Sequence, residues 1–227
     1  DGRQKSRPQK WRPEKQCGLI DLAEPVGIRV AGREIPLRPW GFEVGSGDNY
    51  VPLLLLDACG YPAAAGFENI TGHLYQSDTR TRLMQEIVLG VGGMRLLTDT
   101  LGLNPAFFHL NEGHAAFAPA EYMAALPYSV DNLRAVRERF SFTTHTPVPA
   151  GFDKFFVRDI DEMLTGKRLA DLVLSYGRDP HNTDYINMAR LALQMSGVVN
   201  GVSHLHAEVS QLMFPEFSPI IPITNGV

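Results

Sequence analysis

The sequence predicts an α/β fold, in which a mainly parallel β-sheet has helices packed on both of its faces. Two patterns along the 227 residues support this prediction. Short apolar runs of strand length alternate with longer segments in which apolar residues recur every three or four positions, as in amphipathic helices. Strands that alternate with helices in this way favour a parallel sheet. Polar residues follow several of the runs directly, which is where such folds bind ligands.

The composition is that of one globular unit. The chain is long enough for one large domain with a hydrophobic core and barely enough for two. Its net charge of −4 gives no indication of binding to nucleic acid or to an anionic membrane. No apolar run approaches the roughly 20 residues that span a bilayer. The two cysteines, Cys17 and Cys59, show no disulfide or zinc spacing, which indicates a reducing, cytoplasmic setting.

We expect residues 1–227 to form a single, partial domain with two regions. Residues 1–50 are predicted to be a peripheral region of loops and a hairpin that turns at Ala31-Gly32. The first 16 residues carry six basic side chains against two acidic ones. We expect them to be a solvated loop of a longer chain, and a tail that binds polyanions is the alternative. Residues 51–227 are predicted to be the α/β core.

The predicted core begins with the apolar run Val51–Asp57, interpreted as a buried strand. A helix follows over residues 79–100, although each of its glycines costs about 1 kcal/mol relative to alanine. Glycines such as Gly90 indicate that another backbone packs closely there. The other strands are expected at 106–111, 140–144, 197–203 and 220–224. The other helices are expected at 114–126, 130–140, 153–164, 168–176, 184–195 and 204–214.

Polar residues collect at the carboxyl ends of these strands, which share one edge in a parallel sheet. They are Asn111, Glu112 and His114 after the second strand, His145 and Thr146 after the third, Ser203, His204 and His206 after the fourth, and Asn225 after the last. His109, inside the second strand, is expected in the core. Many neutral donors and acceptors suit the hydroxyl groups of a sugar. The pattern alone therefore predicts an α/β domain with a polar ligand-binding edge.

Each of these residues has a purely structural alternative. Asn111 or Glu112 could cap the helix that follows, and spacing alone favours this. His145 could be a turn histidine whose hydrogen bonds are satisfied locally. His204 and His206 lie two apart on an expected helix and face different directions, so no metal site is predicted. The sequence contains no P-loop, dinucleotide-binding glycine motif or nucleophile elbow.

Five longer motifs extend this interpretation. They are Glu86-Ile-Val-Leu-Gly-Val-Gly-Gly-Met-Arg-Leu-Leu, His109-Leu-Asn-Glu-Gly-His-Ala-Ala-Phe, Phe142-Thr-Thr-His-Thr-Pro-Val-Pro-Ala-Gly, Asn200-Gly-Val-Ser-His-Leu-His and Ile223-Thr-Asn-Gly-Val. In wording, order and spacing they resemble the glycogen or α-glucan phosphorylase family, in its shorter bacterial form. The resemblance runs from about Val51 to Val227, and residues 1–50 fit it loosely.

The resemblance implies the Rossmann-like N-terminal lobe of a two-lobed GT-B glycosyltransferase, incomplete in this chain. Such enzymes transfer a glucosyl unit, with retention, between an α-1,4-glucan and phosphate, which releases glucose 1-phosphate. Pyridoxal phosphate, held on a lysine of the second lobe, takes part in proton transfer. The implied partners are the glucan, phosphate or glucose 1-phosphate and the second lobe, and a homo-oligomer is left open. None of the five lysines has a Schiff-base setting, so we expect this chain to hold no cofactor and to be inactive alone.

The resemblance also implies roles for individual residues. His145 is similar to the catalytic histidine beside the scissile bond, whose backbone carbonyl faces the anomeric carbon and whose side chain faces a sugar hydroxyl. The implied substrate-binding residues are Glu112, His114, Thr146, Asn225 and, on a loop at the mouth of the cleft, Asp78.

Two other functions remain as alternatives at this point. A glucan synthase that uses a nucleotide-sugar would share the two-lobed architecture without pyridoxal phosphate, although the motif at 142–151 is phosphorylase-like. A non-catalytic, glucan-binding remnant of a phosphorylase gene is the second alternative, and the intact motif residues disfavour it.

Overall fold

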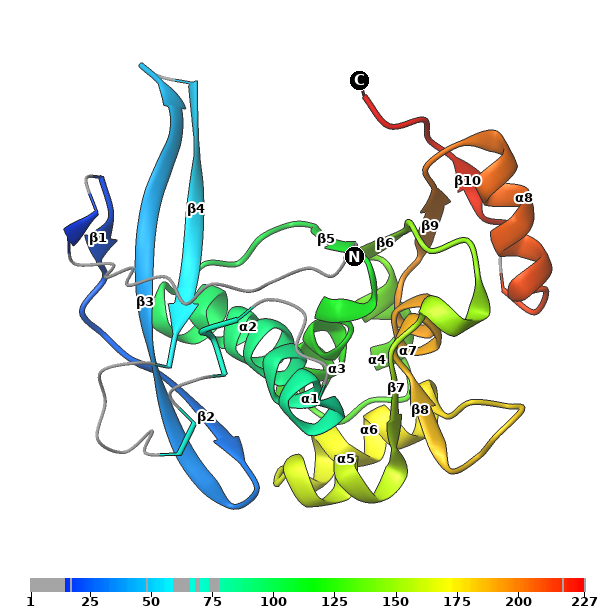
Figure 1. Ribbon diagram of the computed structural model, residues 1–227, viewed down its shortest axis with the longest axis horizontal. Coiled ribbons are helices and arrows are strands. Elements are labelled where there is room, and N and C mark those ends of the chain that lie inside the picture. Colours follow the sequence, from blue (N-terminus) through cyan, green and yellow to red (C-terminus); the bar gives the residue numbers. More distant parts are fainter. Residues whose placement is uncertain are drawn as a thin grey trace, which may run out of the picture.

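The computed structural model describes residues 15–16, 18–47, 49–58, 66–67, 70–73, 78–217 and 219–226. Cys17, Cys59 and most of the basic segment at 1–16 therefore lie outside the described residues. Figure 1 shows a long antiparallel hairpin beside an α/β body, with one long helix running between the two. The polar edge expected from the sequence belongs to the α/β body.

The first part of the chain forms an antiparallel sheet. Its strands are β1 (Ile20–Asp21), β2 (Val26–Val30), β3 (Arg33–Ser46) and β4 (Asn49–Asp57). β3 pairs with the other three strands. Ala31 and Gly32 have φ angles of 49° and 75°, as a two-residue type I′ turn between β2 and β3 requires. The hairpin expected at this turn is confirmed.

The expectation that Val51–Asp57 is a buried strand of the parallel sheet is wrong. This run lies in β4, which pairs antiparallel with β3 along its whole length. Val51 is 68% exposed and Leu53 is 45% exposed. A continuous apolar run lacks the alternation that would separate a one-sided hairpin strand from a fully buried one, so the sequence predicted the strand but not its partner.

The α/β body contains the expected parallel sheet. Its strands are β5 (Phe108–Asn111), β6 (Phe140–Thr144), β9 (Val198–Gly201) and β10 (Ile221–Pro222), in the order β10-β9-β6-β5. All three pairings are parallel. A separate antiparallel pair, β7 (Lys154–Phe156) with β8 (Tyr185–Asn187), occupies positions that the sequence analysis assigned to helices. The α/β class with a parallel sheet is thus confirmed.

The expected helix at 79–100 is continuous, although its winding changes along its length. It consists of α1 (Thr79–Ile87), the π-helical turn η3 (Val88–Gly92), α2 (Gly93–Arg95) and a second π-helical turn, η4 (Leu96–Thr100). A Cβ added at Gly90 would lie 2.7 Å from the Cβ of Phe117 and 3.0 Å from the backbone nitrogen of Ala118. Another helix therefore packs on bare backbone at Gly90, as predicted.

The remaining helices belong to the α/β body, and some of them pack on the parallel sheet. They are η5 (Gly113–Ala115), α3 (Phe117–Ala125), α4 (Asn132–Arg137), η6 (Pro149–Gly151), α5 (Val157–Met163), α6 (Lys167–Gly177), α7 (Met188–Met195) and α8 (His204–Met213). α4 and α7 contact β6, whose Phe140 and Phe142 are fully buried. α8 contacts β9 and β10. None of the helices formed by the described residues is both long enough and apolar enough to cross a membrane.

α8 turns its apolar side outward. Leu205 and Leu212 are 71% and 82% exposed, whereas His206 and Ser210 are buried. Ile221 of β10 and Ile223 just after it are also exposed. Apolar side chains are thus gathered on the surface of the last part of the described chain.

Candidate functional site

The carboxyl ends of the parallel strands meet at one edge of the sheet. Asn111 at the end of β5 pairs with Thr143 of β6, and the Glu112 N–H donates to the Thr143 carbonyl at 2.9 Å. Further along the same edge, beyond β9 and β10, the Asn225 N–H donates to the carbonyl of Val202 at 3.2 Å. Two strand spacings separate β6 from β10, which is roughly 10 Å. The structure therefore places His145, after β6, and Asn225 along the same edge.

The carboxylate of Glu112 organises the turn that follows β6. Its Oε1 accepts the backbone N–H of His145 in a short hydrogen bond, the N–H of Thr146 at 3.0 Å and the hydroxyl of Thr144 at 3.3 Å. Its Oε2 accepts the N–H of Gly113 at 3.3 Å, which caps η5. Glu112 thus caps the following helix through Oε2, as the structural alternative expected. Its Oε1 binds a different segment, the turn at residues 144–146.

The backbone of Glu112 is strained. Its φ of 66° and ψ of 174° lie in a region that is essentially restricted to glycine. Such a conformation costs of order 1–3 kcal/mol and persists where the surrounding structure over-determines it. Strained residues of this kind cluster at active sites and ligand-binding sites, which singles out this edge of the sheet.

The ring of His145 is held by the neighbour of Glu112. Its Nε2 lies 3.0 Å from Oδ1 of Asn111. An amide oxygen can only accept, so Nε2 carries the hydrogen of this bond, and in the neutral ring Nδ1 is left as an acceptor. Asn111 was expected as a polar residue of the edge, but nothing in the spacing indicated that it would bind this ring.

His114 lies in a different environment from His145. Its Nδ1 is 3.5 Å from Oδ2 of Asp153 and 3.8 Å from Oε1 of Glu86. Nη2 of Arg82 also contacts Oδ2 of Asp153, at 2.5 Å. Glu86 is buried, and neither of its carboxylate oxygens has a hydrogen bond from the described residues. Arg82, Glu86 and His114 line a pocket of about 360 Å³ together with His73 and Gln85.

The charges of this cluster are strongly perturbed. Burial raises the pKa of Glu86 to about 8. The nearby carboxyl groups of Asp153 and Glu86 raise the pKa of His114 to about 10. Burial opposes ionisation of Asp153, but the interactions with His114, Glu86 and Arg82 outweigh it and lower the pKa of Asp153 to about 2. At neutral pH, His114 is therefore a cation held against the carboxylate of Asp153.

The stability of the chain is expected to fall between pH 7 and pH 9. The folded-state pKa of His114 lies above its unfolded value of about 6.5, so its stabilising effect is complete below that pH and is lost as the pH rises towards 10. Glu86 acts with the same sign, because its raised pKa makes ionisation near pH 8 unfavourable in the folded state. Denaturant unfolding at several pH values measures the effect. His114→Gln should flatten this pH dependence, and His204→Gln, at an exposed position, should not. Equal slopes in all three proteins would contradict the role given to His114.

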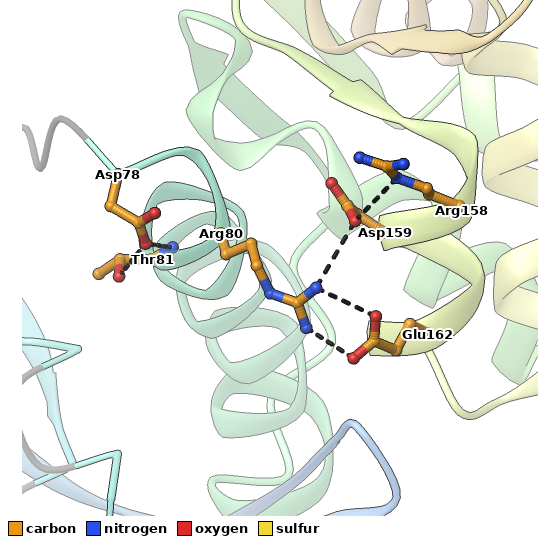
Figure 2. Close-up of polar contacts among 6 residues, drawn as sticks. All are labelled: Asp78, Arg80, Thr81, Arg158, Asp159 and Glu162. Atoms are coloured by element: carbon orange, nitrogen blue, oxygen red, sulfur yellow. Dashed lines mark hydrogen bonds and ion pairs between the residues drawn. The ribbon is translucent and has the colours of Figure 1, made fainter.

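Asp78 is the N-cap of α1. Its Oδ2 accepts the backbone N–H of Thr81 at 2.8 Å and the hydroxyl of Thr81 at 2.6 Å, and these bonds lower the pKa of Asp78. Figure 2 shows this pair on one side of the first turn of α1, away from the neighbouring ion-pair network. Among the described residues, no hydrogen bond or ion pair joins Asp78 to the edge of the parallel sheet.

The ion-pair network beside Asp78 ties the start of α1 to α5. Arg80 makes two hydrogen bonds to the carboxylate of Glu162, at 2.6 and 3.1 Å, and lies 3.6 Å from Asp159 (Figure 2). Arg158 lies 3.7 Å from the same carboxylate oxygen of Asp159.

The expectation that His109 belongs to the core is wrong. His109 is exposed on β5, and its ring bonds Ser141 through Nδ1 at 2.9 Å and Thr143 through Nε2 at 3.1 Å. The Thr143 hydroxyl in turn donates to Oδ1 of Asn200 at 2.6 Å. Alternation along β5 puts His109 on a polar face of the sheet, opposite the face of Phe108 and Leu110, which are buried.

Three members of the His114 cluster were missed by the sequence analysis: Arg82, Glu86 and Asp153. Glu86 carried a usable signal, because it is a charged residue beside Leu83 and Ile87 on the buried side of a helix. Asp153 carried none, since it lies in a loop 39 residues beyond His114 and meets it only through the fold.

Comparison with known proteins agrees with the motifs. No protein-family model matches the chain. The chain is 36% identical to the maltodextrin phosphorylase of Thermococcus litoralis in an alignment of 250 positions, which covers 100% of this chain and 29% of that protein. It is 35% identical to the glycogen phosphorylase of Mycobacterium tuberculosis over 236 residues, covering 90% of this chain and 27% of the relative. It is 31% identical to the glycogen phosphorylase of Aquifex aeolicus over 220 residues, covering 88% of this chain and 30% of that relative.

The chain thus spans less than a third of the length of these relatives. The alignment with the maltodextrin phosphorylase covers the whole of this chain, including the residues at the carboxyl edge of the parallel sheet. The chain belongs to the glycogen and maltodextrin phosphorylase family.

Proposed function

We propose that this chain forms the sugar-binding side of the active-site cleft of an α-1,4-glucan phosphorylase. The complete enzyme would transfer a glucosyl unit from the glucan to phosphate, with retention, and release glucose 1-phosphate. The observation that carries the proposal is the hold of Asn111 and Glu112 on His145, at the edge where open α/β sheets bind ligands. The names of the relatives, glycogen and maltodextrin phosphorylase, supply the substrate class.

In this proposal His145 is the catalytic residue. Its backbone carbonyl presents a partly negative oxygen to the anomeric carbon, where positive charge develops in the transition state. Its ring Nδ1 accepts a hydrogen bond from a sugar hydroxyl, because Asn111 already engages Nε2. Thr146 and Asn225 line the sugar pocket from two strand ends. His114 adds a cation beside the pocket, and Asp78 lies near its mouth.

The lysines of the described residues do not fit a Schiff-base site. Nζ of Lys154 forms an ion pair with the buried Asp179 at 2.6 Å, and Lys15 and Lys167 are exposed. We therefore assign pyridoxal phosphate, which supplies proton transfer in the reaction, to a part of the protein outside this chain. Without that part the sugar face stays open to water, so the chain alone is proposed to be inactive.

The proposal includes a second lobe that faces this one, as in a GT-B enzyme. The exposed apolar residues of α8 and β10 support contact with a further part of the protein, because soluble proteins rarely leave such groups uncovered. The substrates and the cysteine usage are consistent with a cytoplasmic enzyme.

The test is the release of glucose 1-phosphate from maltodextrin and phosphate. It compares the 227-residue chain with the complete natural protein that contains it, and the absorbance of pyridoxal phosphate is recorded for both. We expect turnover and cofactor absorbance in the complete protein only. Turnover by the chain alone would overturn the proposed division of roles. A complete protein without cofactor that instead uses a nucleotide-sugar would be a glucan synthase.

A further inference from the structure

Two consecutive residues, Asn111 and Glu112, hold the backbone and the ring of His145 separately. We propose that both are positioning residues: Glu112 aims the backbone carbonyl of His145 at the sugar, and Asn111 fixes the ring so that Nδ1 accepts a hydrogen bond. This inference rests on the proposed function. It assigns to Glu112 an indirect role in place of the direct sugar contact expected from the sequence.

The peptide unit between His145 and Thr146 is planar, and this lets Glu112 set its direction. The carbonyl of His145 and the N–H of Thr146 belong to one peptide group and, in the trans form, point in opposite directions. There are no cis peptide bonds in the described chain. Because Oε1 of Glu112 accepts this N–H at 3.0 Å, the His145 carbonyl must point away from Glu112. One hydrogen bond therefore sets the direction of the oxygen that faces the anomeric carbon.

The charge of Glu112 adds to this effect. Hydrogen bonds to an ionised acceptor are roughly twice as strong as neutral ones. A carboxylate at the N–H end of a peptide group also polarises it, because hydrogen-bonded groups in series strengthen one another. The carbonyl oxygen of His145 consequently becomes a better acceptor and a more negative partner for a developing cation.

The carboxylate has little capacity left for a sugar. Each oxygen has about two lone-pair sites, and Oε1 of Glu112 already receives three donors, from Thr144, His145 and Thr146. Oε2 receives the N–H of Gly113. A carboxylate that binds sugar hydroxyls would keep its acceptor sites free, whereas those of Glu112 are mostly occupied by donors of the protein itself.

Asn111 completes the arrangement from the adjacent position. Its Oδ1 binds Nε2 of His145 at 3.0 Å and so selects the tautomer whose Nδ1 is unprotonated. The ring then requires a donor from the ligand, which a sugar hydroxyl supplies. The strained φ of 66° at Glu112 is consistent with these two contacts, because it allows the consecutive side chains of Asn111 and Glu112 both to reach His145.

The first test uses Glu112→Gln in the complete natural protein, with Glu138→Gln as the control, an exposed glutamate that lies before β6 and outside the site. We expect Glu112→Gln to lower kcat about 100-fold, as for a small misplacement of a reacting group, with little change in KM for maltoheptaose. Amide hydrogen exchange at His145 and Thr146 should become roughly tenfold faster, because a charged hydrogen bond is replaced by a weaker, neutral one. The control should match the parent in both measurements.

A raised KM with unchanged kcat would overturn the proposal, because it would show a direct sugar contact. Unchanged exchange at His145 and Thr146 would overturn it as well. Hydrogen exchange is measured without turnover. If exchange changes as expected but the complete protein releases no glucose 1-phosphate, the proposed function is wrong, whereas the role of Glu112 in binding this turn stands.

The second test uses the exposed Asn111, where a substitution is tolerated even if Glu112→Gln does not fold. Asn111→Leu should lower kcat about tenfold, the effect of one lost hydrogen bond. Asn111→Asp keeps an acceptor oxygen and should restore most of the activity. Equal activity of the two variants would contradict the role of Asn111.

Discussion

Replacing His145 with alanine in the complete natural protein should lower kcat for glucose 1-phosphate release by about 100- to 1000-fold, the range found when one preorganised polar contact is removed. The variant loses the ring acceptor for the sugar and the link from Nε2 to Asn111. It keeps the backbone carbonyl and its hold by Glu112, so residual activity should remain. The cofactor absorbance should be unchanged, because the cofactor is assigned outside this chain.

The matched control is His181→Ala, which removes an exposed histidine from the loop between α6 and β8. Steady-state kinetics with maltodextrin and phosphate, recorded with an absorbance spectrum of each variant, separate a catalytic effect from cofactor loss. A His145→Ala variant that retains full kcat would show that this edge of the sheet is not the catalytic one.

A second substitution pair should change stability in opposite directions. Gly90→Ala forces a methyl group to 2.7 Å from the Cβ of Phe117 and 3.1 Å from its Cα. Overpacking of this kind typically costs about 1–3 kcal/mol of the free energy of unfolding. At Gly93, three residues further along the same helix, a methyl group meets nothing within 4 Å. Gly93→Ala should therefore stabilise the chain by up to about 1 kcal/mol, the difference in helix propensity.

Denaturant unfolding of the chain and of the two variants measures both effects. Both variants replace glycine with alanine in the same helix. Opposite signs of the change in the free energy of unfolding therefore isolate the contact with Phe117. If Gly90→Ala were as stabilising as Gly93→Ala, the close approach of α3 to the long helix would be wrong.

Local sequence patterns predicted several elements because their signals are self-contained. Phe140–Thr144 was predicted with the bounds that β6 has, and the turn at Ala31-Gly32 specified the first hairpin. The strands β7 and β8 were missed for a physical reason. Each has only three residues and runs directly into a helix, α5 or α7, so its alternation is too short to stand out from the helical periodicity that follows.

The candidate site could be predicted only as a set of strand ends. The rule that parallel strands share a carboxyl edge placed Glu112, His145 and Asn225 together. What each side chain binds depends on tertiary contacts that no spacing contains. Glu112 satisfies backbone groups 33 and 34 residues away, and Asp153 meets His114 through the packing of a loop against a helix.

The connections within the parallel sheet also determine when the candidate site can exist during folding. Pairing β5 with β6 joins residues 32 apart, and pairing β6 with β9 joins residues 57 apart. Closing such loops costs chain entropy before any contact is gained, and non-local pairings of this kind fold slowly. The β2–β3 hairpin closes across two residues, and hairpins form within about 1–10 μs. We therefore expect a folding chain to acquire this hairpin early, and His145 to reach Asn111 and Glu112 only after β5 has paired with β6.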